Sequence, residues 1–395
     1  MIAQAILQFG TSRFLQAHVD LFVSQAIDRC DPNAGGICVV QSTASTISTA
    51  RVAALAGGEG YPVHIRGVRH GHSLDYGLNC GAIRAAVHAD SHWRQLLDAI
   101  ASEVRVIVSN TGDRGFRLDE RDEATLLTQT WRAPRSYPAK LVVLLHHRWR
   151  ECPHAPLSLF PCEPVERNGD TLRDMVTRLA QQWRLPGSFV AWLWRHCVWA
   201  NSVVDRMVGQ ALHPVGAVTE PYALWAIERR PGLVLPCSHE AIVLTDDLEK
   251  HERFKLFLLH AGQTYLAELW LARSSPKDMT VLQAMNHREM RAELEAMWAE
   301  EVVPIFQALG QETAALAYLV DLRERLLNPF LEHRLADIAE NHAPKKVRRL
   351  GPILTLNSQL SLQLPQTRLR AALISRVEAK PFAPVARRHS RGAGA

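Results

Sequence analysis

A strand, a glycine turn, a helix and a second strand follow one another at the amino-terminal end of the chain. The apolar stretch "AQAILQFG" predicts a strand that ends at Gly10, and "GGICVVQS" predicts a second strand. Between them, "FLQAHVDLFVSQAIDR" carries apolar side chains at helical spacing. Two strands joined through a helix form a βαβ unit, and this crossover makes the strands parallel. The chain therefore begins with a predicted parallel sheet.

The alternation continues over roughly the first 240 residues, which is typical of a doubly wound α/β domain. Strands are predicted at "GYPVHIRGV", "VRVIVSN" and "LSLFPCE", and helices at "SHWRQLLDAIASE", "SYPAKLVVLLHHRWR" and "GDTLRDMVTRLAQQW". Ser91 is expected to cap the first of these helices. After Asp247 nearly every segment has helical periodicity. We predict a Rossmann-like dinucleotide-binding domain at 1–247, a mostly α-helical substrate and catalytic domain at 248–385 and a basic, disordered tail at 386–395.

Composition restricts the classes of partner. A net charge of +5 with acidic and basic residues interspersed gives no support to nucleic-acid binding. No apolar run approaches the roughly 20 residues needed to cross a bilayer. The start "MIAQAILQFG" lacks a signal-peptide pattern, so we expect a cytoplasmic protein. The 7 cysteines form no C-x-x-C pair, which argues against a zinc site and fits free thiols. The expected partner is a small molecule, and the chain is expected to be a monomer or a homodimer.

The turn after the first strand is a candidate nucleotide site. In an open parallel sheet, ligands bind beyond the carboxyl ends of the strands, where a residue without a side chain lets the backbone approach phosphate. Gly10 meets this need, but Ser12 and Leu15 replace the other glycines of the G-x-G-x-x-G pattern. A simple strand–helix turn is the alternative. The second strand ends at Gln41, without the acidic residue that grips a ribose 2′-hydroxyl, so we expect NAD with NADP not excluded.

Several stretches, in chain order, resemble the polyol-specific long-chain dehydrogenases. This family includes mannitol dehydrogenase and, closest in pattern, the tagaturonate and fructuronate reductases. The resemblance rests on "ILQFGTSRFLQAHVD", "VSNTGDRGF", "SYPAKLVVLLHHR", "LFPCEPVERNGDTLRDMV", "WANSVVDRMV", "TEPYALWAIE" and "RLLNPFLEHRLADIA". It implies a metal-independent NAD(P) enzyme that interconverts a secondary alcohol and a ketone on an open-chain sugar acid or polyol. The cofactor-binding residues that it implies are Phe9, Gly10, Thr11, Ser12, Arg13, Phe14, Gln41, Asn110, Thr111 and Asn168.

The family's catalytic signature, K-x-x-x-x-N-x-x-H, falls on the stretch "KLFLLHAGQT". Lys255 matches the lysine, whereas His260 and Gln263 occupy the asparagine and histidine positions. A lysine acts as the acid–base group only where burial or nearby cations lower its pKa. On a helix, residues three apart share a face, so His260 and Gln263 can look into one site. Either these replacements give an altered but active site, or the chain is an impaired homologue that binds nucleotide or sugar acid as a sensor or partner subunit.

Three further residues are candidates for substrate binding. The resemblance places Arg325 and Lys345 beside the catalytic lysine, where an arginine can grip a substrate carboxylate with two hydrogen bonds. It also assigns Asn201 to substrate hydroxyls. From the residues alone, Lys255 could be a solvated surface lysine, Arg325 could pair with a neighbouring acid on a solvated face, and Asn201 could complete a buried turn. The "PKKVRR" stretch permits more than one choice for Lys345.

Overall fold

The computed structural model describes residues 4–42, 46–112, 115–273 and 275–375, so the tail predicted at 386–395 lies outside them. The chain divides into two compact units, Met1–Glu252 and Arg253–Ala395. The periodicity had placed this boundary at 247, just before helix α8 (Leu248–Arg253).

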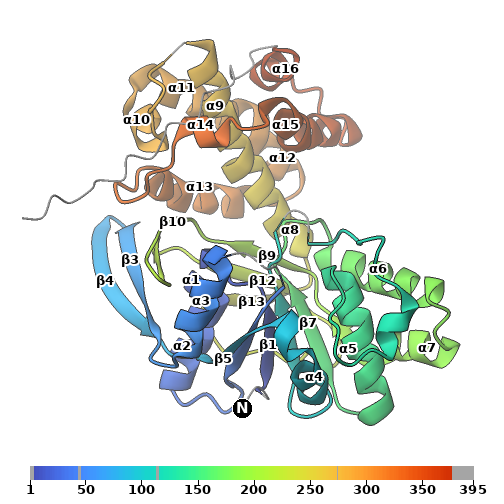
Figure 1. Cartoon of the computed structure of the whole chain (residues 1–395). Helices are drawn as coiled ribbons and strands as arrows, with labels where there is room; N and C mark the ends of the chain where they lie inside the picture. Colours follow the sequence, from blue (N-terminus) through green and yellow to red (C-terminus); the bar gives the residue numbers. More distant parts are fainter. Residues whose placement is uncertain (1–3, 43–45, 113–114, 274, 376–395) are drawn as a thin grey trace, which may run out of the picture. The chain divides into compact units, whose positions relative to one another are not determined.

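A six-stranded parallel sheet forms the centre of the first unit, with strand order β5-β2-β1-β6-β7-β8 (Figure 1). In that order the strands are β5 (Ile83–His88), β2 (Ile37–Gln41), β1 (Ile6–Phe9), β6 (Val106–Ser109), β7 (Leu157–Pro161) and β8 (Cys197–Trp199). The chain winds outward from β1 first on one side and then on the other, so the predicted doubly wound sheet is confirmed.

Side chains of β1 alternate between two apolar cores, as the period of a strand requires. Leu7 and Phe9 pack into one core and Ile6 into the other. The helices of the first core are α4 (Ala89–Ile100), α5 (Tyr137–Glu151), α6 (Asn168–Gln182) and α7 (Gly187–Arg195). Those of the second core are α1 (Arg13–Ala17), α2 (Val19–Asp28) and α3 (Thr46–Ala56). Burial on both faces explains why the strand sequences are continuously apolar rather than alternating.

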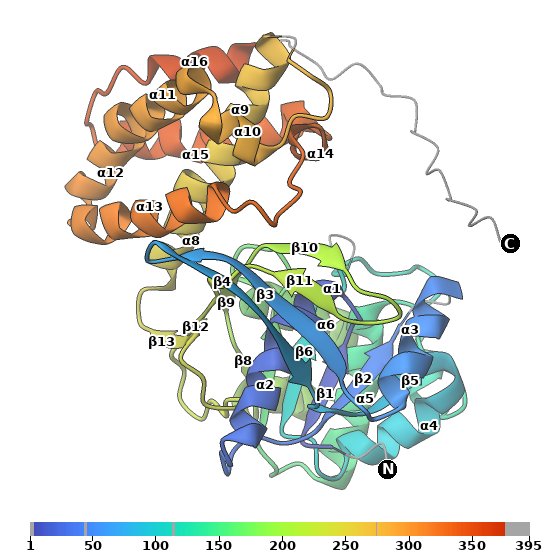
Figure 2. The same ribbon diagram turned by 90° about the vertical axis from the view of Figure 1, so that its left-hand side faces the viewer.

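Two smaller sheets accompany the parallel one, and the alternation of strands and helices did not separate them from it. The strand predicted at "GYPVHIRGV" exists, but it belongs to a four-stranded sheet of order β10-β11-β3-β4, where β3 and β4 form a long hairpin (Figure 2). The third sheet has the order β13-β12-β9. The bounds are β3 (Tyr61–Arg69), β4 (His72–Cys80), β9 (Ser202–Asp205), β10 (Val208–Ala211), β11 (Ala217–Thr219), β12 (Leu224–Glu228) and β13 (Ile242–Thr245), with a short 3₁₀ turn η1 (Ala124–Leu127).

The prediction that Ser91 caps α4 is wrong. The helix begins at Ala89, directly after β5, and His88 is the residue at its N-cap position. The Ser91 hydroxyl lies 2.8 Å from Nδ1 of His92 and 3.4 Å from the His88 carbonyl oxygen, so it caps no free N–H group. A kink at His92 (φ −124°, ψ 19°) separates this first turn from the regular helix that follows, and the capping pattern at Ser91 marks the start of neither part.

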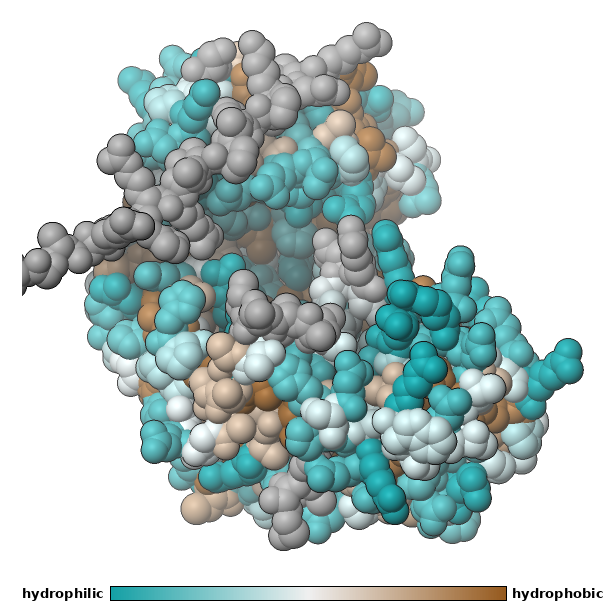
Figure 3. All heavy atoms as spheres, in the orientation of Figure 1, coloured by the Kyte–Doolittle hydropathy of each residue, from teal (hydrophilic) through white to brown (hydrophobic). Residues whose placement is uncertain are grey.

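The second unit is mostly helical, as predicted. Its elements are the π-helical segment η2 (Phe254–His260), α9 (Ala261–Ala272), α10 (Val281–Asn286), α11 (Arg288–Ala296), the π-helical segment η3 (Met297–Val302), α12 (Val303–Ala308), α13 (Glu312–Leu326), α14 (Leu335–Ile338), α15 (His342–Gln359) and α16 (Thr367–Ile374). Among the residues that the structure describes, no helix is both long and apolar enough to cross a membrane. On the face shown in Figure 3, hydrophilic residues predominate and apolar ones form scattered patches.

A buried histidine makes the first unit sensitive to acid. The ring of His18, between α1 and α2, is 0% exposed and contacts the rings of Phe14, Phe22 and Trp225. Its Nε2 lies 3.1 Å from the carbonyl oxygen of Leu224. Burial lowers the pKa of His18 from 6.5 to about 3, so its imidazole is neutral in the native protein at neutral pH.

Below pH 6.5 the unfolded chain binds a proton at His18 that the native state does not, so native stability is lost as the pH falls toward 3. Asp20, whose pKa burial raises to about 6, contributes the opposite slope between pH 6 and 3.8. The comparison with His18→Gln isolates the histidine. From pH 7 to 5 the free energy of unfolding should fall by about 2 kcal/mol more in the wild type than in the variant. Urea titrations followed by circular dichroism measure both values, and parallel pH profiles would contradict a neutral His18.

Candidate functional site

Most of the predicted cofactor residues meet at the carboxyl edge of the parallel sheet. Phe9 ends β1 and Gly10 follows it, Gln41 ends β2, and Asn110 and Thr111 follow β6. Because β2 and β6 flank β1, this is the point where the strand order reverses. Ligands of open α/β sheets bind beyond the strand ends at such a point.

Gly10 is required by the close approach of two strand ends. It has φ +120°, and a Cβ atom at this position would lie 2.5 Å from the carbonyl oxygen of Asn110. Ser12 and Leu15, which stand where the pattern has its other two glycines, have structural roles instead. The Ser12 side chain caps α1 by accepting a hydrogen bond of 3.2 Å from the Leu15 N–H, and Leu15 is fully buried. The turn thus keeps the one bare backbone position that a close approach of pyrophosphate needs.

Thr11 connects the ends of β1 and β2. Its hydroxyl donates to Oε1 of Gln41 at 2.8 Å, and both side chains are buried. Arg51 on α3 donates to the Thr11 carbonyl oxygen at 3.0 Å, which the sequence analysis missed. This hydrogen bond joins residues 40 positions apart, so no local sequence pattern marks Arg51. The edge next to the second strand therefore presents a neutral amide and a guanidinium.

The other residues of the turn differ in what they offer. The Phe9 side chain packs in the core at a ring distance of 5.1 Å from Tyr137, so only its backbone reaches the sheet edge. Arg13 is exposed and donates to the carbonyl oxygen of Gly209 at 2.8 Å. Phe14 is half-buried, with its ring stacked on His18.

A buried carboxylate joins the "SNT" and "PCE" motifs. Glu163 accepts hydrogen bonds from the Ser109 hydroxyl at 3.0 Å and from the N–H and hydroxyl of Thr111 at 2.9 and 2.8 Å. The Asn110 amide donates to the Cys162 carbonyl oxygen at 3.1 Å. Burial raises the pKa of Glu163, partly opposed by the hydrogen bonds from Thr111 and Ser109. These contacts hold the ends of β6 and β7 at fixed positions beside Gly10.

The side chain of Asn168 is used entirely within the first unit. It is 2% exposed, and its amide donates to the carbonyl oxygens of Pro161 and Ser202 at 2.9 and 3.0 Å. Its Oδ1 accepts from the N–H groups of Gly169 and Ser202, both at 3.0 Å. The geometry gives Asn168 the role of tying the end of β7 to the start of β9.

Asn201 lies in the centre of an ion cluster. It is 0% exposed, and its amide donates to Asp170 and Glu228, both at 2.9 Å. Arg230 bridges the same two carboxylates at 2.8 and 2.6 Å. Burial opposes ionisation of Asp170, but hydrogen bonds from Asn201, Arg230 and Arg167 outweigh it and lower the pKa of Asp170 to about 2. These contacts are of the kind that the buried-turn alternative for Asn201 predicts.

In the second unit, a π-helical segment carries the lysine predicted to be catalytic. Lys255 and His260 are half-buried residues of η2, and Gln263 follows on α9 with 6% exposure. On an α-helix, residues five apart are rotated by about 140°. A π-helix bonds residue i to i+5, which brings Lys255 and His260 onto one face, and such segments are frequent at functional sites. The family's K-x-x-x-x-N spacing of five residues therefore matches the turn of this π-helical segment.

Trp298, on η3, supports this segment. Its indole N–H donates to the Leu258 carbonyl oxygen at 3.1 Å, and the ring lies against Gly262. A Cβ atom on Gly262 would lie 2.7 Å from Cζ2 of the ring. The glycine in "HAGQ" is therefore explained by packing.

Replacing Gly262 with alanine should lower the stability of the second unit by about 1–3 kcal/mol, because the added Cβ would overlap the buried ring of Trp298. Gly351→Ala on α15 is the matched control, since a Cβ there meets nothing within 4 Å. Thermal unfolding compares the two. A Gly262→Ala protein that melts with the control would show that the indole can shift.

Two predicted basic residues come from helices that pack against η2, namely α13 and α15. Arg325 on α13 is 4% exposed, which excludes a solvated face, and it lies 3.3 Å from the Tyr318 hydroxyl. The structure also separates the two lysines of "PKKVRR". Lys346 is buried against Glu268 at 3.0 Å, whereas Lys345 is half-buried and donates to the Ile338 carbonyl oxygen at 3.0 Å.

A histidine that the sequence analysis did not single out lies beside Gln263. The amide Nε2 of Gln263 is 3.5 Å from Nδ1 of His333, which follows the "NPF" motif. Because an amide NH₂ group only donates, this contact suits a neutral imidazole whose Nδ1 accepts. Burial lowers the pKa of His333, which favours this neutral form. An imidazole is thus present next to the position where the family histidine is missing.

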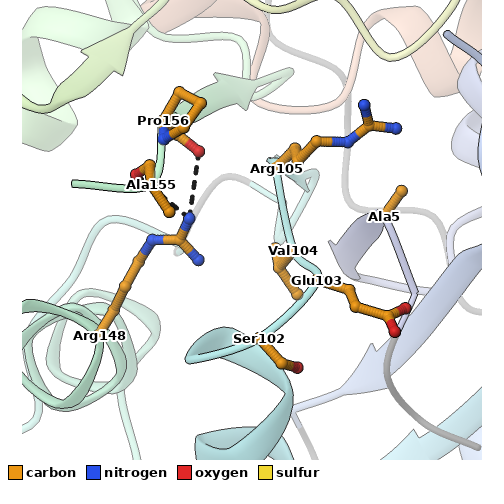
Figure 4. A pocket seen from close by; sticks show the side chains of 8 residues that line it. All are labelled: Ala5, Ser102, Glu103, Val104, Arg105, Arg148, Ala155 and Pro156. Atoms are coloured by element: carbon orange, nitrogen blue, oxygen red, sulfur yellow. Dashed lines mark hydrogen bonds between the residues drawn. The ribbon is translucent and has the colours of Figure 1, made fainter. Parts of the chain in front are cut away.

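A hollow of about 460 Å³ lies at the opposite, amino-terminal edge of the parallel sheet, lined in part by Ala5 and Arg105 (Figure 4). Arg148 points into it but donates to the carbonyl oxygens of Ala155 and Pro156 at 3.3 and 3.1 Å. None of the predicted site residues lines it. Within the part of the chain that the structure describes, no group of three or more His, Cys, Asp or Glu side chains is arranged to hold a metal ion.

Comparisons with known proteins agree with this architecture. A sequence model of the mannitol dehydrogenase Rossmann domain matches residues 4–233. The altronate oxidoreductase of Halalkalibacterium halodurans is 30% identical over 375 residues, covering 89% of this chain and 70% of that protein. The altronate oxidoreductase of Yersinia pestis is 30% identical over 399 residues, covering 94% and 79%.

Two solved structures share the fold. A D-sorbitol dehydrogenase in substrate-free form has a TM-score of 0.76 at 17% identity, covering 93% of this chain and 79% of that one. The Pseudomonas fluorescens mannitol 2-dehydrogenase in its ternary complex with NAD and D-mannitol has a TM-score of 0.71 at 17% identity, covering 94% and 78%.

Proposed function

Since the chain belongs to the mannitol dehydrogenase family, we propose that it interconverts a secondary alcohol and a ketone on an open-chain sugar acid. The enzyme class, an NAD-dependent dehydrogenase, follows from the family, and the resemblance recognised in the ordered motifs is confirmed. The sugar acid is favoured over a neutral polyol because two relatives at 30% identity are altronate oxidoreductases. The cationic side chains predicted to bind the substrate, Arg325 and Lys345, could also pair with a carboxylate.

The observation that carries the proposal is the π-helical segment that brings Lys255 and His260 onto one face. Lys255 is half-buried, and the helices carrying Arg325 and Lys345 pack against its segment. The alcohol-to-ketone direction requires the neutral amine of Lys255, because only that form can act as a base.

In the alcohol-to-ketone direction, Lys255 Nζ would take the proton from the hydroxyl oxygen, and the hydride would leave from the carbon that bears this hydroxyl. His260, Gln263 and His333 supply N–H donors for the oxygen on which negative charge develops. Bound NAD provides the hydride acceptor. Ser12, Gly10 and the linked Thr11–Gln41 pair would hold it at the sheet edge.

We propose NAD as the cofactor, with NADP also accepted. Gln41 carries no charge that would repel a 2′-phosphate, and Arg51 contributes a cation near the same strand end. The acidic residue that usually selects NAD at this strand end is replaced here by Gln41, so this position does not discriminate against NADP.

The decisive experiment is a substrate panel with both cofactors. Altronate, tagaturonate, fructuronate, mannitol and fructose are mixed with the protein and NAD(H) or NADP(H), and the nicotinamide absorbance is followed. We expect turnover with a sugar acid and less with the neutral compounds. NADH binding, seen by fluorescence, without turnover of any compound would overturn the proposal and favour an impaired homologue that acts as a sensor.

A further inference from the structure

Helix α15 begins with a run of basic side chains that lie in different environments. His342 and Lys346 share the buried carboxylate of Glu268, with Nε2 and Nζ at 2.8 and 3.0 Å from Oε2. Lys346 therefore has an internal counter-ion, and His342 has an internal hydrogen-bond partner. Their presence in the basic run is explained by this contact, which stabilises the second unit.

Among the residues that the structure describes, Arg349 has no such counter-ion. It is half-buried, and its one hydrogen bond within the described residues joins Nη1 to the Thr264 hydroxyl oxygen at 3.1 Å. Burial, and then the charge of Arg348, lower the pKa of Arg349. A cation withdrawn from water is costly unless an anion accompanies it. An acidic ligand is the partner that would remove this cost.

Arg349 also lies next to the row of predicted catalytic residues. Thr264, its partner, follows Gln263 directly and is one helical turn after His260, so it shares a face with His260. The charge of Arg349 acts on His333, whose ring contacts Gln263. An anion held by Arg349 would therefore be bound beside the groups assigned to the reacting oxygen.

We infer that Arg349 binds the carboxylate of the sugar acid and that Thr264 holds the guanidinium in place. A guanidinium offers two parallel N–H groups that match a carboxylate, and the bond to Thr264 uses only one of its five donors. Arg325, the arginine favoured by the resemblance, is 4% exposed and bonded to Tyr318, so it is less accessible than Arg349. This inference rests on the proposed function, because it names the residue that selects an acidic substrate.

The test is calorimetric binding of altronate to the full-length protein saturated with NADH, a complex in which no hydride transfer occurs. Arg349→Gln should weaken altronate binding about 10- to 100-fold, the range for lost hydrogen bonds to a charged group. Arg349→Lys should lie between, because it retains the charge but not the fork. Thr264→Val should weaken binding about 3- to 10-fold. Arg348→Gln, at an exposed neighbouring position, is the matched control and should bind as the wild type does.

The outcomes separate the inference from the function. Melting temperatures and NADH affinities identify variants that fail to fold. Where Arg349→Gln is unstable, the altronate affinity of Arg349→Lys is compared with that of the wild type instead. Altronate binding that is equal in the wild type and in Arg349→Gln would overturn the role of Arg349 and leave the enzyme activity standing. A wild-type protein that binds no sugar acid would overturn the proposed substrate class, and the inference with it.

Discussion

Replacing Lys255 with methionine is expected to lower kcat by about 10²- to 10⁴-fold, the contribution typical of a positioned acid–base group. Methionine keeps an unbranched, apolar stem and removes only the amine that would carry the substrate proton. Because the change affects proton transfer, KM for the sugar acid and Kd for NADH should change little. Steady-state rates at the nicotinamide absorbance and a fluorescence titration with NADH measure these quantities.

Lys277→Met is the matched control, because Lys277 is an exposed lysine of the same unit. It should retain wild-type turnover. A Lys255→Met protein whose kcat stays within about tenfold of the wild type would rule out Lys255 as the acid–base group. A loss confined to KM would instead assign it to substrate binding.

The second large effect concerns the histidine missing from the catalytic signature. His333→Ala should lower kcat by about 10²- to 10³-fold, the loss expected for one donor to a developing oxyanion. Adding Gln263→His to that variant should restore part of the rate, because it returns an imidazole to the position from which the family histidine acts. In an otherwise wild-type chain, Gln263→His with His260→Asn should lower turnover, since the amide contact to His333 is lost.

His72→Ala provides the control for these variants, because His72 is an exposed histidine on β4 of the first unit. Two results would contradict the assignment to His333. One is a His333→Ala protein with wild-type kcat, and the other is a double variant no faster than His333→Ala alone. A rise in turnover on restoring both family residues would mean that the site is a weakened copy of the family arrangement.

Much of the fold could be predicted from the order of apolar segments. The strand ending at Gly10, the helix after it and the strand ending at Gln41 all exist, and the sheet they belong to is parallel and doubly wound. A short apolar run states that a strand is buried, but not which partner it pairs with. For this reason the strand at Tyr61–Arg69 was recognised while its membership of a second sheet was not.

The candidate site shows the same division. The motifs predicted the turn at Gly10 and the row Lys255, His260 and Gln263. The partners of these residues come from distant segments, and local patterns do not contain them. Glu163 lies 52 positions from Thr111, and His333 lies 70 from Gln263.

The sequence by itself determined the class of fold, the family and the lysine where chemistry is expected, because apolar periodicity and ordered motifs are local or cumulative properties of a chain. Only the tertiary structure decided that Asn201 belongs to an ion cluster, that Lys346 has a buried counter-ion in Glu268 and that Arg349 has none within the described residues. The physical reason is that the state of a polar side chain depends on burial and on the charges packed against it. Both are set by contacts between segments far apart in the sequence.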